Sequence, residues 1–326
     1  MTGTEPGLRT ADPTPAGKAG VSVSAAHRHA AAERRLAELA VLGVMVLWGG
    51  NFVVVKAAVA VLPPVGFTFL RFALASVTLL VLLRLREGNV GLPRRDFVAI
   101  AGLGALGFGA YQILWTTGLT TVTAGDSALL IAATPVLVAL LAVFARTDVL
   151  TPNKLAGVLI SFAGAAIVIA SGPGLSLGGS LVGEAITLGA AVCWAIYTAY
   201  AAPYLRRHSP LRATTWATVA GTIVLAPVAI TQLAAIEALP VTFEIIGALL
   251  FSGFLAAGIS NVIVMNGIKV VGPTRTAALQ FLVPALAVVF AAIFLAEPIR
   301  PGQIVGGVVI VAGVLLTRWR PARFRA

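Results

Sequence analysis

Three charged residues, Lys56, Arg71 and Asp126, interrupt stretches of sequence that are otherwise almost entirely apolar. Charged side chains inside a membrane are costly, and they usually face the interior of a helix bundle or a water-filled cavity. The topology developed below places all three at a similar depth near the outer face. They could form an ion-pair network that closes the outer mouth of a cavity, or they could bind an anionic group. The alternative is a structural or snorkelling role, in which the charge reaches the membrane interface.

A fourth ionisable residue, Glu184, falls near the start of the apolar segment 181–201. A carboxyl group in apolar surroundings can exchange a proton near neutral pH, which a proton-coupled carrier requires. Its position at the start of a helix offers an alternative, because an acidic side chain there complements the helix dipole. The sequence therefore allows a proton site at Glu184 without requiring one.

Amide and aromatic side chains recur in the middle of the apolar segments of both halves of the chain. Aromatic walls with a few amides suit a pocket for small amphipathic organic solutes. Packing between helices with a satisfied hydrogen bond is the alternative for any one of them. The candidate lining residues of a central cavity are Trp48, Asn51, Tyr111, Gln112, Trp115, Trp194, Tyr197, Asn261 and Gln280.

Two prolines, Pro135 and Pro284, lie in the middle of apolar segments. A proline inside a helix removes one backbone hydrogen bond and frees the carbonyl four residues earlier, here at Ile131 and Gln280. Broken helices in matching positions of two halves point to a substrate site in transporters. A simple packing kink is the alternative.

The elements that carry these residues occur twice. A shift of 149 residues aligns Pro135 with Pro284, Asp148 with Glu297, Gly157 with Gly306 and Gly164 with Gly313. Matches at proline, glycine and acidic positions carry more weight than matches of alanine or valine in so apolar a chain. We therefore predict two structural repeats of about 150 residues each.

The composition indicates that these repeats lie in a membrane and not in water. Hydrophobic residues make up 59% of the 326 residues and charged residues 11%, with a mean hydropathy of +0.98. A soluble domain is nearer half apolar and a quarter charged. We predict an all-α polytopic membrane protein with ten transmembrane helices, each repeat holding five. The expected helices cover 37–59, 65–85, 97–118, 123–145, 152–171, 181–201, 211–233, 243–268, 273–296 and 301–318.

The basic residues orient these helices. Of the 23 lysines and arginines, all except Lys56, Arg71 and Arg300 fall on the side of the two termini. Positive residues mark the cytoplasmic side, so both termini are expected in the cytoplasm of a multi-pass protein of the cell membrane. An odd number of helices per repeat makes the two repeats inverted. The net charge of +11 follows from topology, so no nucleic-acid partner is expected.

The predicted organisation has four parts. A disordered cytoplasmic tail covers residues 1–36, the two repeats cover 37–171 and 181–318, and a basic cytoplasmic tail covers 319–326. The single cysteine, Cys193, excludes an intramolecular disulfide and any multi-cysteine metal site. No metal or cofactor is expected.

Several motifs resemble those of a known family. Trp48-Gly49-Gly50-Asn51-Phe52, Lys56, Pro63-Pro64, Arg71-Phe72 and Trp194-Ala195-Ile196-Tyr197 are similar to ten-helix members of the drug/metabolite transporter superfamily with two EamA-type domains. The resemblance covers about residues 37–318. It departs from the family at Asp148, where glutamate is usual, and at Asp126, where a small or polar residue is usual. Known members move amino acids, metabolites, drugs and other small organic solutes, commonly outward.

The leading hypothesis is therefore a secondary active transporter, and an exporter, that moves small organic solutes by alternating access. A membrane channel is an alternative, and a membrane-embedded lipid enzyme or sensor is another. No HExxH motif, P-loop or dinucleotide-binding loop indicates an enzyme. The residues predict neither the substrate, the coupling ion nor the oligomeric state.

Overall fold

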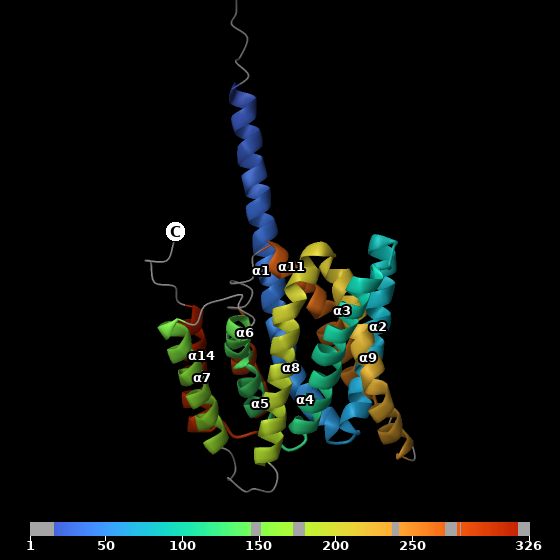
Figure 1. The fold of residues 1–326 in the computed structure, drawn as a ribbon, viewed down its shortest axis with the longest axis vertical. Coiled ribbons are helices and arrows are strands. Elements are labelled where there is room, and N and C mark those ends of the chain that lie inside the picture. Colours follow the sequence, from blue (N-terminus) through green and yellow to red (C-terminus); the bar gives the residue numbers. More distant parts are fainter. Residues whose placement is uncertain are drawn as a thin grey trace, which may run out of the picture.

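A computed structural model describes residues 16–144, 151–171, 180–236, 241–270, 279–280 and 282–318. The described residues form helices, turns and short connections, with no strand among them. The helices, drawn in Figure 1, are α1 (Ala16–Val59), α2 (Pro64–Glu87), α3 (Arg94–Gly104), η1 (Ala105–Ala110), α4 (Tyr111–Leu119), α5 (Ala124–Ile131), α6 (Thr134–Phe144), α7 (Pro152–Ala170), α8 (Ser180–Arg207), α9 (Pro210–Ala234), α10 (Phe243–Leu249), η2 (Leu250–Ile259), α11 (Ser260–Val270), α13 (Leu282–Phe294) and α14 (Pro301–Arg318).

The helices stand side by side in one bundle, and the first helix projects beyond one end of it (Figure 1). We call this the proximal end, and the end where α1 leads into α2 the distal end. The structure differs here from the predicted disordered tail, because residues 16–36 form the start of α1. This stretch is rich in alanine, the residue with the highest helix propensity. Residues 1–15 and the predicted tail 319–326 lie outside the described residues.

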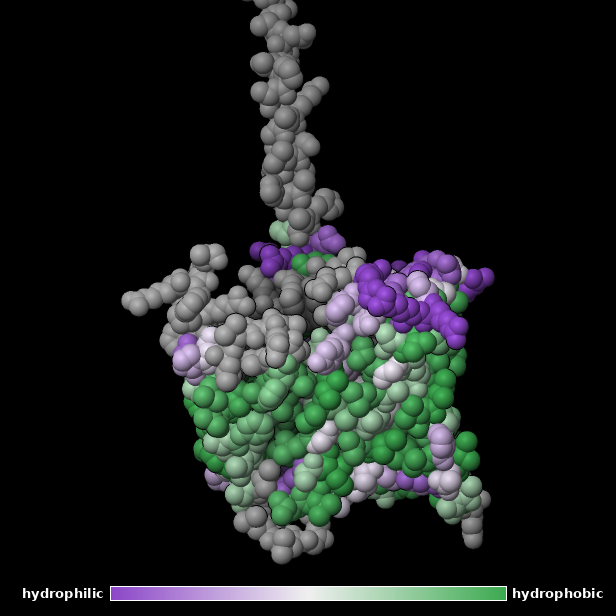
Figure 2. Space-filling view, viewed as in Figure 1, coloured by the Kyte–Doolittle hydropathy of each residue, from purple (hydrophilic) through white to green (hydrophobic). Residues whose placement is uncertain are grey.

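Hydrophobic side chains cover most of the lateral face of the bundle, and hydrophilic ones gather towards its ends (Figure 2). Large apolar residues such as Ile230 and Val308 are more than half exposed. A surface of this kind is stable in lipid and unstable in water. In the described part of the chain, the helical stretches long and apolar enough to span a membrane are Ala31–Val59, Pro64–Glu87, Arg94–Leu119, Leu181–Ala201, Pro210–Ala234 and Phe243–Gly267. Shorter apolar helical stretches cover Ala124–Val138, Leu155–Val168, Leu282–Phe294 and Pro301–Leu316.

Two of the long helices contain π-helical turns. The helix from α3 to α4 widens at η1, and the helix from α10 to α11 widens at η2. Glycines let neighbouring helices approach these segments. A Cβ added to Gly104 would lie 2.2 Å from the Ala217 carbonyl oxygen of α9, and one added to Gly253 would lie 2.6 Å from the Arg71 carbonyl oxygen of α2. Helices α9 and α2 therefore pack directly on η1 and η2 respectively.

Helices α7 and α14 pack through small residues along one side of the bundle. A Cβ added to Gly164 would lie 2.8 Å from the Gly306 carbonyl oxygen, and one added to Gly313 would lie 2.6 Å from the Gly157 carbonyl oxygen. The Ser161 hydroxyl donates to the Ile310 carbonyl oxygen at 3.1 Å. Small residues are the usual means of close helix contact in lipid, where burial from water contributes little.

Candidate functional site

The bundle encloses a cavity of about 350 Å³. Side chains from α1, α2, η1, α4, α5, α6, α8, η2, α11 and α13 contribute to its wall. Most of the residues predicted to line a central cavity do so, namely Trp48, Asn51, Tyr111, Gln112, Trp115, Trp194, Asn261 and Gln280. A cavity of this volume can enclose a small organic molecule.

Aromatic rings make up one wall of the cavity. The Tyr111 and Trp115 rings lie parallel, with centroids 6.2 Å apart, because residues four apart in α4 share a helix face. The Trp194 ring of α8 lies 5.3 Å from Tyr111, and Phe52 of α1 meets Trp115 edge to face at 5.2 Å. The rings brace one another across three helices and hold this wall in place.

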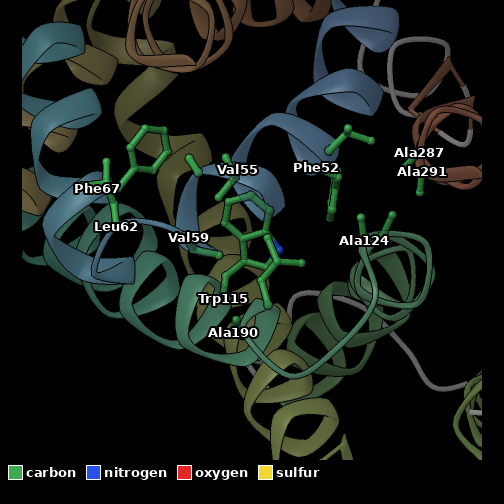
Figure 3. Close-up of a cluster of buried hydrophobic side chains, with 14 of the residues drawn as sticks. Phe52, Val55, Val59, Leu62, Phe67, Trp115, Ala124, Ala190, Ala287 and Ala291 are labelled. Carbon is green, nitrogen blue, oxygen red and sulfur yellow. The ribbon is translucent and has the colours of Figure 1, made fainter. Parts of the chain in front are cut away.

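Hydrogen bonds hold two of the three indoles that line the cavity. The Trp115 N–H donates to the Ser127 hydroxyl of α5 at 3.0 Å, and the Trp48 N–H donates to the Ala256 carbonyl oxygen of η2 at 3.1 Å. Trp115 also belongs to the hydrophobic cluster in Figure 3, with Phe52, Val55, Val59, Leu62, Phe67, Ala124, Ala190, Ala287 and Ala291 among its members. This cluster extends from the cavity to the distal end of the bundle, where α1 ends and α5 begins.

Tyr197 differs from its prediction and is absent from the cavity lining. Its ring packs behind Trp194 and Phe108, at centroid distances of 5.2 and 5.0 Å. A Cβ added to Gly107 of η1 would lie 2.5 Å from this ring, so the glycine accommodates it. Tyr197 therefore supports the aromatic wall from outside.

The four amides that line the cavity occupy different environments. The Asn261 side chain donates to the Ala257 carbonyl oxygen of its own helix at 2.8 Å, and the Gln112 side chain bonds Arg71. Gln280 lies in a turn before α13. The Asn51 side-chain oxygen is buried without a hydrogen-bond partner in the described structure.

Arg71 is the charged residue among the described cavity-lining residues. The sequence had grouped it with Lys56 and Asp126, either as a gate or as a binding site for an anionic group. It is only 2% exposed. One terminal nitrogen donates to the Ser252 hydroxyl at 2.9 Å, and the other donates to the Gln112 side-chain oxygen. Its guanidinium carbon lies 5.4 Å from the Trp115 ring centroid. Arg71 thus places a positive charge in the wall of the cavity.

Asp126 forms its contacts elsewhere, which corrects the predicted three-residue cluster. One carboxylate oxygen accepts from Arg300, and the other accepts from the Gln303 amide at 2.9 Å. Asp126 is 2% exposed. Its partners lie just before and within α14, so this network joins the start of α5 to the far half of the chain. The predicted depth of Asp126 did not determine which neighbouring helix it faces.

Lys56 also lies outside the predicted cluster. Its ammonium group donates to the carbonyl oxygens of Leu119 at 2.6 Å and Val122 at 2.7 Å. The last carbonyls of a helix lack partners within the helix, and a lysine there satisfies them. Lys56 therefore caps the distal end of α4.

Two further acidic residues lie near the distal network. Glu297 accepts from the backbone N–H groups of Ala124 and Gly125 at 3.0 and 3.3 Å, at the start of α5. Glu184 is buried and lies close enough to Asp126 and Arg300 to interact with them electrostatically. The distal end therefore holds three acidic residues from different parts of the chain, of which Asp126 pairs with Arg300 and Glu297 binds the first backbone N–H groups of α5.

Pro135 lies directly after a break between two helices, and Pro284 lies in the first turn of α13. Helix α5 ends at Ile131, two turn residues follow, and α6 begins at Thr134, directly before Pro135. Gln280 lies in a turn, and Pro284 is the third residue of α13. Both turns border the cavity, because Ile131, Gln280 and Pro284 line it.

Sequence reasoning missed several residues of this region. Ser252, which holds Arg71, is one small hydroxyl in an apolar stretch and carries no distinguishing pattern. Arg300 did carry a signal, because it was the one basic residue assigned to the outer face, where Asp126 also lies. Charge pairing on that face could have joined the two residues.

Comparison with known proteins places this geometry among transporters. The model of the EamA-like transporter family matches residues 35–170 and 181–319. The "Uncharacterized transporter YyaM" of Bacillus subtilis (strain 168) is 27% identical over 280 residues, which cover 84% of this chain and 90% of that protein. A "Probable terminal-alkyne amino-acid exporter" of Streptantibioticus cattleyicolor is 30% identical over 279 residues, covering 85% of this chain and 91% of that protein. One solved crystal structure is similar in fold, with a TM-score of 0.64 at 19% identity, over 90% of this chain and 99% of that one.

Proposed function

This chain belongs to the EamA-like transporter family, and on that premise we propose that it is a secondary active transporter that exports small organic solutes by alternating access. Membership makes it a multi-pass membrane protein and a transporter of small solutes. The mechanism of transport, its direction and the class of substrate are what we propose here. The observation that carries it is the central cavity, which is lined from both halves of the chain and bordered by a turn next to a proline-containing helix start in each half.

The proposed architecture is ten membrane helices in two inverted repeats, 37–171 and 181–318. The packing supports it, because equivalent helices exchange partners. Helix α2 packs on η2 as α9 packs on η1, and α1 packs on α13 as α8 packs on α6. The η1 residues fall within η2 after the same 149-residue shift that aligns the prolines. Two halves related in this way can rock around a fixed central site.

The distal contacts support a state in which one entrance is closed. The hydrophobic cluster, the Lys56 cap and the Asp126–Arg300 ion pair all lie between the cavity and the distal end. We propose that the distal end faces outward and both termini face the cytoplasm of the cell, as the basic residues predict. The arrangement then corresponds to closure towards the outside, with Asp126 and Arg300 as the outer latch.

Export and proton coupling complete the proposal. The amino-acid exporter among the relatives favours outward transport of amino-acid-like solutes. Glu184 is the proposed proton site, because a buried carboxylate beside the latch could link protonation to its opening.

Reconstitution of the purified full chain into liposomes tests this function. Liposomes loaded with radiolabelled amino acids, organic acids or organic cations should release at least one solute faster than protein-free liposomes. Release should saturate and show counterflow, in which an unlabelled solute outside drives labelled solute against its own gradient. Imposed pH gradients should change the rate, and Glu184→Gln should remove that change. Release at the protein-free rate for every solute would contradict transport, and release without saturation or counterflow would indicate a channel.

A further inference from the structure

Arg71 carries a charge that the described cavity lining does not neutralise. The other described lining residues are aromatic, aliphatic, hydroxyl or amide side chains, with no aspartate or glutamate among them. The groups that accept its hydrogen bonds, the Ser252 hydroxyl and the Gln112 side-chain oxygen, are uncharged. A buried charge is costly without a counter-charge.

The guanidinium is held in place and retains a free donor. Gly253 brings η2 against the backbone of Arg71, which places Ser252 within hydrogen-bond reach. The Phe72 and Trp115 rings lie 4.9 and 5.4 Å from the guanidinium carbon and restrict its movement. The Nε–H group is buried without a partner in the described structure. Arg71 is therefore oriented by its neighbours while its charge stays available.

The charges near other parts of the cavity do not change this picture. Asp126 is occupied by Arg300 and Gln303 at the distal end, and Lys56 caps backbone carbonyls there. A cavity with one cation and no lining carboxylate attracts anionic groups and repels cationic ones. Arginine binds carboxylates especially well, because its planar group offers paired N–H donors.

We propose that Arg71 binds the carboxylate of the transported solute, which makes the substrate class small carboxylates with an apolar remainder. The carboxylate supplies the counter-charge that the protein lacks, and the aromatic wall packs against the apolar part. Organic cations without a carboxylate are excluded. This inference rests on the proposed transport function and names the chemistry of its central site.

Binding of acid and amide pairs tests the inference. The probes are leucine, methionine and phenylalanine with their C-terminal amides, which keep the side chain and ammonium group but lose the carboxylate charge. Binding to the purified full chain in detergent is followed by isothermal titration. The wild type should bind at least one acid ten-fold or more tighter than its amide. Arg71→Gln should reduce this affinity ratio to near one, because it weakens binding of the acid and not of the amide. Arg71→Lys should keep part of the ratio.

Arg86→Gln is the matched control, since Arg86 is an exposed cation on the same helix α2. It should leave the ratio unchanged.

Elution volume and helical circular dichroism establish that each variant is folded. If Arg71→Gln does not fold, Arg71→Lys decides, because a lysine keeps the positive charge but lacks the paired N–H donors of arginine and should lower the ratio several-fold. Equal affinity for every acid and its amide in the wild type, or an unchanged ratio in the folded Arg71 variants, would overturn the inference. Saturable transport of solutes without a carboxylate would overturn it as well and leave the proposed transport function standing, whereas absence of all transport would overturn that function.

Discussion

At the scale of single residues, the buried polar groups divide into two functional sets. Arg71 lies in the cavity wall, bonded to uncharged partners, whereas Asp126 lies at the distal end, bonded to Arg300 and Gln303. The charge of the first set has no counter-charge in the described cavity lining, which fits the proposed binding of a carboxylate. The charges of the second set are paired across two segments far apart in the sequence, which fits the proposed latch.

The proposed latch makes a charge-reversal prediction. Asp126→Asn and Arg300→Gln should each slow transport by about ten-fold or more, because removing one partner of a buried pair typically costs about 3–5 kcal/mol. The double variant Asp126→Arg with Arg300→Asp should recover part of the rate in liposomes. Glu244→Gln is the control, since Glu244 is an exposed acid near the same end. Equal transport rates in the wild type, the two single variants and the double variant would rule out a latch at this pair.

Local sequence pattern indicated which residues border the cavity better than it indicated which residues contact each other. Aromatic and amide residues in mid-segment had few stable places except a protein cavity, and most line one. Tyr197 failed because the lining depends on which ring a neighbouring glycine, Gly107, accommodates. The pairing of Asp126 failed because depth along a helix says nothing about the neighbour it faces. Its partner, Arg300, lies in the other half of the chain, so only tertiary packing determines the contact.

At the scale of helices, turns beside the cavity contrast with close glycine contacts at one side of the bundle. The turns after Ile131 and at Gln280 interrupt helices beside the cavity. By contrast, α7 and α14 pack through backbone contacts at Gly164 and Gly313, which leave no room for even a methyl group. We therefore expect the first pair of elements to bend during transport and the closely packed α7 and α14 to stay fixed.

This division predicts the effect of removing the two prolines. Pro135→Ala and Pro284→Ala should insert normally and slow transport several-fold, because alanine allows the helix to close its hydrogen-bond pattern and stiffens it. The double variant should be slower than either. Pro227→Ala is the control, because Pro227 lies inside α9 away from the described cavity lining. Unchanged turnover in the two single variants and the double variant would exclude a hinge at these positions.

Helix positions were more predictable than helix ends. Helices α2, α9 and α14 begin at prolines, namely Pro64, Pro210 and Pro301. The apolar runs that follow these prolines predict the helices themselves. The early start of α1 could not be read from hydropathy, since residues 16–36 form helix without an apolar run. The π-helical turns at η1 and η2 also escaped prediction, because they depend on contacts with α9 and α2.

At the scale of the whole molecule, the central claim is that the cavity opens alternately to the two sides of the membrane. A cavity in the middle of the bundle, with a polar latch and a hydrophobic cluster towards one end, suits a protein with two alternative states. Such states commonly differ by only a few kcal/mol, so one broken ion pair can change which is populated.

The most direct measurement is two-sided labelling of a cavity cysteine. Asn51→Cys in a Cys193→Ala background provides one reactive thiol in the cavity wall, and a membrane-impermeant maleimide is applied to either side of oriented vesicles. We expect rapid labelling from the cytoplasmic side and slow labelling from outside. Adding Asp126→Asn should speed the outside reaction about ten-fold or more and slow the cytoplasmic one. Equal labelling from both sides, or an outside rate that Asp126→Asn does not change, would contradict alternating access controlled by this latch.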